Sequence, residues 1–556
     1  MKKYVFLLII VGSHWFVNAQ NPPFDWSEVP VAEMQAVDNA ELKARYAAHE
    51  KRAKREPLQF AHGFHTNIGH DDFKAFKDKK GRVWKAINIH SSGALSLNIG
   101  FDMLDIPDNT KLYLYSHSEK SWLGPLQKEK PEVEDYWSPI VKGETVGIAF
   151  VLNEDKKTSS NWHIHSVNHD FIGFQSIVSG SCNVDVRCGA ADGFPDIDNY
   201  RDLIRSVGVY SIDGRFTCSG ALVNTSDYGC TPYFLTANHC VDENTNYASM
   251  VVYWNYENST CRTPGSPQSE ATGDGTLEQF NSGASFRSTN GQSDYTLVEL
   301  AGEIADEVNA HLAGWDRDRN APNQAIAIHH PATEEKRISF EYDPLTISDY
   351  LDDDEDPSAD FLRVEDWDLG TTEGGSSGSP IFNERGQIVG QLSGGFASCT
   401  RNEPDWYGAM YSNFERGLDS ANNIAFWLDE NQTELSFVNG IDYNTCQDLD
   451  FLFEPIEKQA CSNQDSIIYR FTNTSSVDSV FLGYNLLGVG ATAIWTSTPN
   501  LGPMDAVNLI ITDLANYSNG RHIFEVAFQK AMKTELFSLE LEKSSLPNRP
   551  NSIEPL

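Results

Sequence analysis

The stretch GGSSGSPIFNERGQIVGQL, residues 374–392, joins a loop rich in glycine and serine to two short apolar runs separated by turn residues. Comparable runs, bounded by Gly, Asn and Asp, recur through the region that begins at Ser181, and such runs predict short strands. Many short strands without long helices favour a β-barrel or a β-sandwich. One helix is expected at the end of this region, over residues 414–431.

Two more motifs lie in the same region. TANHC, residues 236–240, follows the apolar run YFL. In SDYTLVEL, residues 293–300, the acid Asp294 directly precedes a predicted strand. A serine hydroxyl is a weak nucleophile at neutral pH and needs a base within hydrogen-bond reach. Histidine suits that task because its pKa lies near neutrality, and a buried carboxylate fixes the tautomer of its ring.

The three motifs therefore supply a candidate triad of His239, Asp294 and Ser377. Glycines beside the serine let the backbone turn so that the amides of Gly375 and Ser377 face a developing oxyanion. Each motif is weak by itself, since isolated histidines and Gly-Ser loops are common. The chain order His, Asp, Ser is that of the chymotrypsin-like template, and the combination predicts a serine peptidase.

The region resembles the bacterial lysyl endopeptidases of the chymotrypsin-like clan. The resemblance covers residues 177–442 and is carried by the runs SGSCNVDVRC, YFLTANHC, VVYWNYENSTCR, AIAIHHP, TTEGGSSGSPIF, GQLSGG and DWYGAMYS. It implies a double β-barrel with the triad between the barrels, and cleavage after lysine through an acyl-enzyme. By the same resemblance, His239 is the general base, Asp294 orients it, and Ser377 is the nucleophile.

The residues that select the substrate come from the same resemblance. Trypsin places its pocket carboxylate six residues before the nucleophile, where this chain has Thr371. The lysyl endopeptidases place an aspartate after the nucleophile, and Asp405 matches it, although it would otherwise be read as a surface acid. The family's stacked histidine and tryptophan are replaced, with Tyr350 at about the tryptophan position. The histidine position belongs to a run of expected substrate-binding residues: Ser393, Gly394 and Gly395.

The lysine content changes from region to region. Residues 177–442 contain thirteen Arg and one Lys, Lys336, whereas residues 1–176 contain seventeen Lys. A lysine-specific protease gains by removing its own cleavage sites from the mature domain while leaving a discarded segment digestible. Compositional drift toward arginine is the alternative explanation. Avoidance of lysine but not of arginine favours a lysyl over an arginyl enzyme.

Seven of the nine cysteines lie in the protease-like region, and the sequence alone does not fix their pairing. The resemblance implies the pairs Cys182–Cys399, Cys188–Cys261 and Cys218–Cys240. These pairs leave Cys230 as a buried thiol or a partner in an intermolecular bond. In the C-terminal segment, Cys446 and Cys461 are expected to pair locally.

The chain divides into four expected segments. Residues 1–19 combine Lys2 and Lys3 with a short apolar run and small residues, which predicts a removed secretory signal and an extracellular protein. Residues 20–176 are expected to be a β-rich propeptide that assists folding and blocks the cleft as an intramolecular inhibitor. Residues 177–442 are the expected protease domain, and residues 443–556 alternate apolar runs with turns, as in an immunoglobulin-like β-sandwich.

The chain is strongly acidic. Its 556 residues carry a formal net charge of -37, which argues against nucleic acid or membrane partners. The expected partners are protein and peptide substrates with exposed lysine. No Cys-x-x-Cys or His-Glu-x-x-His motif is present, so no metal and no cofactor are expected. The acidic run Asp352–Asp356 is expected to be a solvated loop, and the pair His329-His330 to be structural.

Two alternatives stay open. The first keeps the serine chemistry but extends the specificity to arginine or to a broader class. The second is a non-catalytic binding protein built on a protease fold, with the C-terminal sandwich as the active part. The intact triad argues against the second alternative.

Overall fold

The structure is a computed structural model. It describes residues 24–50, 56–105, 110–126, 135–152, 161–174, 178–241, 245–433 and 435–446, together with strands between residues 451 and 543. The expected signal segment 1–19 and the expected propeptide boundary at residues 176 and 177 lie outside the described residues. Among the described helices, none has the length and apolar character needed to cross a membrane.

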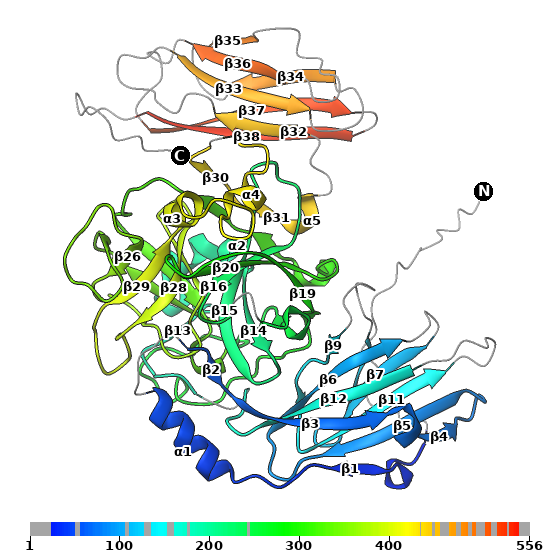
Figure 1. Cartoon of the computed structure of the whole chain (residues 1–556). Helices are drawn as coiled ribbons and strands as arrows, with labels where there is room; N and C mark the ends of the chain where they lie inside the picture. Colours follow the sequence, from blue (N-terminus) through cyan, green and yellow to red (C-terminus); the bar gives the residue numbers. More distant parts are fainter. Residues whose placement is uncertain are drawn as a thin grey trace, which may run out of the picture. The chain divides into compact units, whose positions relative to one another are not determined.

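Residues 24–174 form two β-sheets that share one apolar core, drawn in blue and cyan in Figure 1. Alternate residues of each strand enter that core, as Val146, Ile148 and Phe150 do, because successive side chains of a strand point to opposite faces. The first sheet has the order β1 (Val31–Glu33), β5 (Val83–His90), β11 (Thr145–Leu152), β7 (Lys111–Ser116), β8 (Ser121–Leu126), with β4 (Lys74–Lys77) paired to β5. The second has the order β10 (Val141–Lys142), β6 (Ser96–Asp105), β12 (Asn161–Asp170), β3 (Ala61–Gly69), with β9 (Tyr136–Trp137) paired to β6. One helix, α1 (Asn39–Glu50), lies between β1 and β3 in the chain.

The first of two large sheets in the protease-like region, here called the first protease sheet, is antiparallel. All six residues of β14 (Val207–Ile212) are buried, which explains why this strand has a nearly continuous apolar sequence. The order is β18 (Phe280–Ser282), β17 (Val251–Tyr253), β14, β15 (Phe216–Val223), β16 (Tyr233–Ala237), β20 (Tyr295–Leu300), β19 (Ala284–Asn290). A short strand from the N-terminal region, β2 (Leu58–Gln59), pairs with β15.

A further sheet completes the protease-like region. Its core contains Leu392 and Tyr407 from neighbouring strands, packed with Trp367 from a loop. The order is β13 (Val184–Asp185), β24 (Arg337–Glu341), β23 (Ala325–His329), β27 (Pro380–Phe382), β28 (Gln387–Gly395), β29 (Asp405–Ala409), β26 (Phe361–Val364), β25 (Thr346–Ser348). Two more strands extend this sheet: β22 (Gly314–Asp316) pairs with β28, and β30 (Phe437–Val438) pairs with β22.

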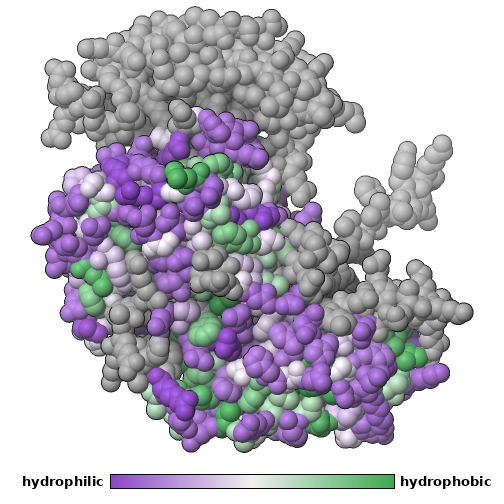
Figure 2. Space-filling view, viewed as in Figure 1, coloured by the Kyte–Doolittle hydropathy of each residue, from purple (hydrophilic) through white to green (hydrophobic). Residues whose placement is uncertain are grey.

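The surface of the described residues is mainly polar, as the high content of acidic residues predicts. The acidic run Asp352–Asp356 is exposed, as the sequence predicts. The visible face of the described residues is mostly hydrophilic, with scattered apolar residues (Figure 2).

The single helix expected over residues 414–431 is wrong. The chain forms two short helices, α3 (Met410–Glu415) and α4 (Ala425–Leu428), separated by a turn. Gly417 adopts a φ of 88°, which a helix cannot contain, and the side chain of Asn422 accepts the amide hydrogen of Leu418 at 2.7 Å. The turn chemistry of glycine and asparagine therefore overrides the helical spacing of the apolar residues.

The chain separates into two compact units. The first contains residues 1–225 and 231–440, so the N-terminal region and the protease-like region belong to one unit. The second contains residues 226–230 and 441–556. Its described strands form one sheet in the order β32 (Phe451–Pro455), β33 (Ser466–Asn473), β36 (Ala506–Thr512), β35 (Thr492–Trp495), and another in the order β34 (Val480–Leu486), β37 (Gly520–Lys530), β38 (Lys533–Lys543). The expected pair Cys446–Cys461 lies outside the residues whose side chains are described.

Candidate active site

Two neighbouring strands bring the predicted histidine and aspartate together. His239 follows β16 and Asp294 precedes β20, and the register of these antiparallel strands sets Ala237 opposite Tyr295. Nδ1 of His239 lies 2.8 Å from Oδ2 of Asp294, and the backbone amide of His239 donates to Oδ1 at 2.9 Å. Their side chains are only 4% and 2% exposed. The aspartate therefore fixes both the ring and the loop that carries it.

Asp294 is held in an uncommon backbone conformation, with a φ of 57°. Its backbone oxygen accepts from the amide of Asn238 at 3.1 Å, and the hydroxyl of Ser393 donates to its Oδ2. Ser393 was expected in the wall of the substrate pocket, but its side chain contacts Asp294, the predicted aspartate of the triad. Strained residues that the surroundings fix in this way are concentrated at functional sites.

The predicted nucleophile lies on a tight loop. Gly375 and Gly378 both have positive φ, 91° and 78°, which residues with a Cβ rarely adopt. A Cβ at Gly378 would lie 2.2 Å from Oγ1 of Thr236, so this close approach requires glycine. The backbone oxygen of Ser377 accepts from the amide of Ser219 at 2.8 Å, which ties the loop to β15 of the first protease sheet.

His329 contacts this loop through the hydroxyl of Ser376, in agreement with its expected structural role. Its Nδ1 lies 2.8 Å from the hydroxyl of Ser376, and its Nε2 lies 3.2 Å from the hydroxyl of Ser339. Burial lowers the pKa of His329 to about 3, so the ring is neutral at neutral pH and can both donate and accept. His330 is also fully buried, with its ring stacked on Tyr256.

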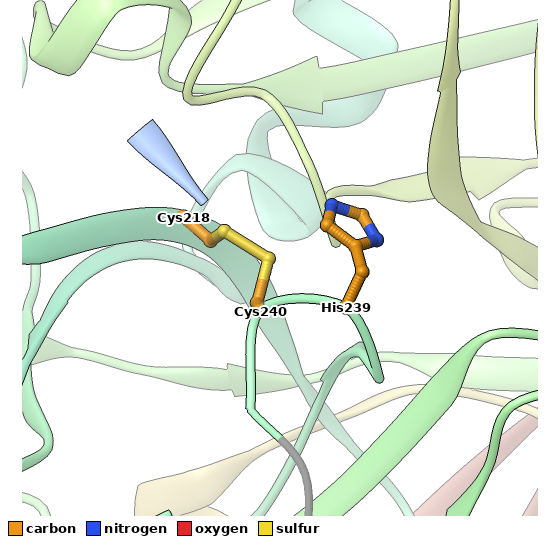
Figure 3. Close-up of side chains that lie close together, drawn as sticks. All are labelled: Cys218, His239 and Cys240. Carbon is orange, nitrogen blue, oxygen red and sulfur yellow. A yellow bond between two sulfur atoms is a disulfide. The ribbon is translucent and has the colours of Figure 1, made fainter. Parts of the chain in front are cut away.

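The pairs of cysteines are those that the resemblance implies. Disulfides join Cys182 to Cys399, Cys188 to Cys261 and Cys218 to Cys240. The last of these lies beside His239, because Cys240 is the next residue in the chain (Figure 3). Cys230 is a free cysteine, and burial together with the nearby Asp227 raises the pKa of its thiol to about 11. The Cys218–Cys240 disulfide limits the motion of the loop that carries His239.

Asp405 lies at the start of β29 and is 1% exposed. Its Oδ2 accepts hydrogen bonds from Nε1 of Trp367 at 2.8 Å and from the hydroxyl of Thr372 at 2.6 Å. The register of β28 and β29 sets Gly395 opposite Asp405, and a Cβ at Gly395 would lie 2.1 Å from Oδ1. Only a glycine therefore allows β28 to approach the carboxylate this closely.

Ser377, Asp405, Gly394 and Gly395 line the same cavity, whose volume is about 1100 Å³. The cavity thus contains both the predicted nucleophile and the predicted pocket acid. Tyr350, at the family's tryptophan position, packs its ring at 6.1 Å from the ring of Trp406.

The sequence did not single out Trp367 or Thr372 as partners of Asp405. Thr372 lies inside the motif TTEGGSSGSP, so its place beside the nucleophile was visible in principle. Strands β27 and β28 and their loops lie between Trp367 and Asp405 in the chain, and no local pattern connects the two residues. Only the pairing of β26 with β29 brings them together.

Comparisons with known proteins agree with this geometry. Residues 177–408 match the model of the family described as lysyl endopeptidase, C-terminal domain. The lysyl endopeptidase of Pseudomonas aeruginosa is 25% identical over 391 residues, which cover 65% of this chain and 81% of that protein.

Solved structures give weaker matches. The secreted serine protease VesC of Vibrio cholerae is 14% identical at a TM-score of 0.26, with 61% of this chain and 69% of that chain covered. The inactive form of Rv3671c from M. tuberculosis is 13% identical at a TM-score of 0.25, with 42% and 91% covered. At these TM-scores the family relationship rests on the sequence matches.

The strand-dominated fold, the buried His–Asp pair and the match to lysyl endopeptidases identify the chain as a serine endopeptidase. Residues 177–408 resemble the C-terminal domain of the lysyl endopeptidase family.

Proposed function

We propose that the protein is a secreted enzyme that hydrolyses peptide bonds on the carboxyl side of lysine. The observation that carries this proposal is the buried carboxylate of Asp405 in the cavity that Ser377 also lines. A lysine side chain that enters this cavity exchanges water for a charge-assisted hydrogen bond to a carboxylate. A neutral side chain of the same length gains no such compensation, so the carboxylate selects a cation.

The catalytic steps follow from the contacts of the triad. Nε2 of His239 is buried and has no hydrogen-bond partner among the described residues, so it is the atom that takes the proton from the hydroxyl of Ser377. Asp294 holds Nδ1 and stabilises the imidazolium. Ser377 attacks the carbonyl carbon, and the amides of Gly375 and Ser377 stabilise the oxyanion. The histidine then protonates the leaving amine, and water hydrolyses the acyl-enzyme.

The distribution of lysine supports the preference for lysine over arginine. Lys336, the one lysine of residues 177–442, has a side chain with 0% exposure. Its Nζ donates to the backbone oxygen of Ile204 at 2.7 Å and lies 3.1 Å from a carboxylate oxygen of Glu257. The region therefore offers a lysine-specific protease no accessible lysine within its described residues, although arginines on its surface are common.

A digest tests the specificity directly. Denatured proteins incubated with the processed enzyme are expected to yield new C-termini that are lysine, read by mass spectrometry. A large share of C-termini at arginine would establish the broader alternative instead. Failure of a fluorophosphonate to label Ser377 in the processed protein would establish the non-catalytic alternative.

Asp405→Asn separates binding from chemistry. Loss of the buried charge is expected to lower kcat/KM for lysine substrates by about 10²- to 10⁴-fold, since breaking a buried ion pair costs about 3–5 kcal/mol. Labelling of Ser377 by a small fluorophosphonate should persist. Glu403→Gln, an exposed acid two residues away, is the matched control and should retain activity. Equal activity of the two variants would show that the pocket acid lies elsewhere.

We also propose that residues 20–176 act as a propeptide that covers the cleft. Strand β2 adds to β15 with Leu58 opposite Thr217, next to the disulfide at Cys218. Arg45, Pro57 and Leu58 line the same cavity as Ser377. An added strand gains main-chain hydrogen bonds whatever its sequence, which is how extended peptides bind a sheet edge.

An apolar interface holds this region against the first protease sheet. Phe60 and Phe174 pack in one cluster with Val209 and Tyr253, and all four are buried. The amide of Ile140 donates to the hydroxyl of Tyr253 at 2.9 Å. The shared core explains how the N-terminal region would both support the folding of the protease and inhibit it.

Leu58→Asp tests the inhibition, because it introduces a charge into the buried interface. In a full-length chain that also carries Asp405→Asn to suppress self-processing, a bulky fluorophosphonate is expected to label Ser377 faster. Val31→Asp, at a side chain that is 51% exposed, is the control. Equal labelling rates in the two variants would contradict inhibition by β2.

Secretion rests on the sequence of residues 1–19 and on the disulfides, which persist in oxidising compartments. N-terminal sequencing of protein recovered from the culture medium is expected to give a chain that lacks these residues. Retention of the intact precursor inside the cell would contradict the proposal.

A further inference from the structure

Three carboxylates converge at the end of strand β24, away from the triad. Glu341 is the last residue of that strand, Asp343 follows it closely, and Asp368 comes from the loop after β26. One carboxylate oxygen from each of the three lies within 4.8 Å of the others. Backbone hydrogen bonds fix the arrangement, because the amide of Tyr342 donates to Oδ2 of Asp368 at 2.8 Å.

Glu341 gives this cluster a property that surface acids lack. Glu341 is only 2% exposed. Oε1 accepts from the amide of Asp343 at 2.7 Å, whereas Oε2 is buried and has no hydrogen-bond partner among the described residues. A buried carboxylate oxygen without a donor is costly, and such groups normally pair with a cation or coordinate a metal.

The surroundings supply no positive charge to Glu341. Within the part of the chain that the structure describes, no Lys, Arg or His forms an ion pair with any of the three acids. Asp366 adds a further negative charge nearby. The folded chain thus concentrates negative charge at a place where one oxygen is already stripped of water.

We propose that Glu341, Asp343 and Asp368 bind a Ca²⁺ ion, with water molecules completing its coordination. Ca²⁺ takes six to eight oxygen ligands in flexible geometry, and it accepts a mixture of carboxylates and water. Mg²⁺ demands a near-ideal octahedron, which three acids on a strand end and a loop do not offer. Zn²⁺ prefers nitrogen and sulfur ligands, and the cluster contains neither.

The ion would tie β24 to the loop that leads into the nucleophile segment. Phe340 and Leu369 already form a bridge between the two, with the amide of Phe340 donating to Leu369 at 2.8 Å. Two residues beyond Leu369, the backbone oxygen of Thr371 accepts from the hydroxyl of Ser339 on β24 at 2.8 Å. A bound ion would therefore stabilise the side of the fold that supports the serine loop.

Thermal unfolding of the full-length chain carrying Ser377→Ala tests the site without self-digestion. Extracellular Ca²⁺ modules have dissociation constants of about 10⁻⁴–10⁻³ M. At about 10 mM Ca²⁺ the folded form should therefore gain about ten- to hundredfold over the unfolded form, seen as a rise in Tm relative to EDTA. Mg²⁺ at the same concentration should give a smaller rise.

Matched variants make the result specific. Glu341→Gln should abolish the rise with Ca²⁺, and Asp343→Asn, at an exposed ligand that tolerates substitution, should weaken it even if Glu341→Gln folds poorly. Asp354→Asn, in the exposed acidic run, should retain the full rise.

Three results would overturn the proposal. These are no rise in the parent chain, an undiminished rise in both cluster variants, and an equal rise with Mg²⁺. The first would mean that Glu341 and Asp368 share a proton in place of an ion.

Discussion

The N-terminal and protease regions of the first unit are both built from β-sheets, yet they differ in their disulfides and in the exposure of their lysines. Residues 24–174 contain no cysteine, whereas residues 178–440 are crossed by three disulfides. Eight of the nine lysines whose side chains are described in residues 24–174 are exposed, such as Lys79 and Lys80 in the turn after β4. The single lysine of the protease region, Lys336, is buried.

Two regions of similar architecture therefore offer a lysine-specific protease very different numbers of exposed lysines. Both regions have cores of buried apolar side chains, so neither is weak for want of packing. Disulfides restrict the unfolded and locally opened states of the protease region, in which proteases cut, and burial hides Lys336 in the folded state. These differences support the propeptide role proposed for the N-terminal region.

The largest expected effect is produced by Ser377→Ala. Removal of the nucleophile should lower kcat by about 10⁶-fold, the size found when a catalytic serine is replaced. If the enzyme digests its own N-terminal region, the full-length chain should then accumulate uncut, as seen by intact mass. Ser358→Ala, at an exposed serine, is the control and should process normally. Normal processing of the Ser377→Ala chain in a protease-free host would contradict self-digestion.

Part of this site could be predicted from the sequence because short motifs carry it. TANHC and SDYTLVEL each combine a catalytic residue with a strand, so the pairing of β16 with β20 brings His239 and Asp294 together. The Gly-Ser loop likewise predicts the positive φ of Gly375 and Gly378. Local patterns therefore predict those contacts that strand pairing creates directly.

The remainder of the site depends on contacts that no motif contains. Ser393 could be placed next to the pocket glycines, but the direction of its hydroxyl, toward Asp294, depends on a register shift between Leu392 and Gly394. Trp367 reaches Asp405 only through the packing of β26 on β29.

The acids of the proposed cation site illustrate the same limit. They belong to a strand end and to a distant loop, so the sequence, judged by zinc motifs, predicted no metal.

A smaller effect is expected from glycine-to-alanine substitutions, which should cost more stability in the protease region than in the N-terminal region. Gly378→Ala should lower stability by several kcal/mol and impair activity, because its Cβ would meet Thr236 and the backbone of Ser219 in addition to the strain of a positive φ. Gly81→Ala has a similar φ of 80° with open space around it, so only the backbone strain of about 1–2 kcal/mol should appear. Chemical denaturation of both variants in the Ser377→Ala background gives the comparison, and equal losses would contradict it.

The smallest expected effect comes from giving the protease region an exposed lysine. Leu418 is 95% exposed in the turn between α3 and α4, so Leu418→Lys should leave the fold intact and create one accessible cleavage site. Slow cutting after this position is expected during storage of the active enzyme, because a folded turn must open before it can enter a protease cleft. Leu418→Arg is the matched control, since it adds the same charge at the same place. Cutting of both variants would contradict selection for lysine, and survival of both would show that disulfides and packing protect this region without the removal of lysine.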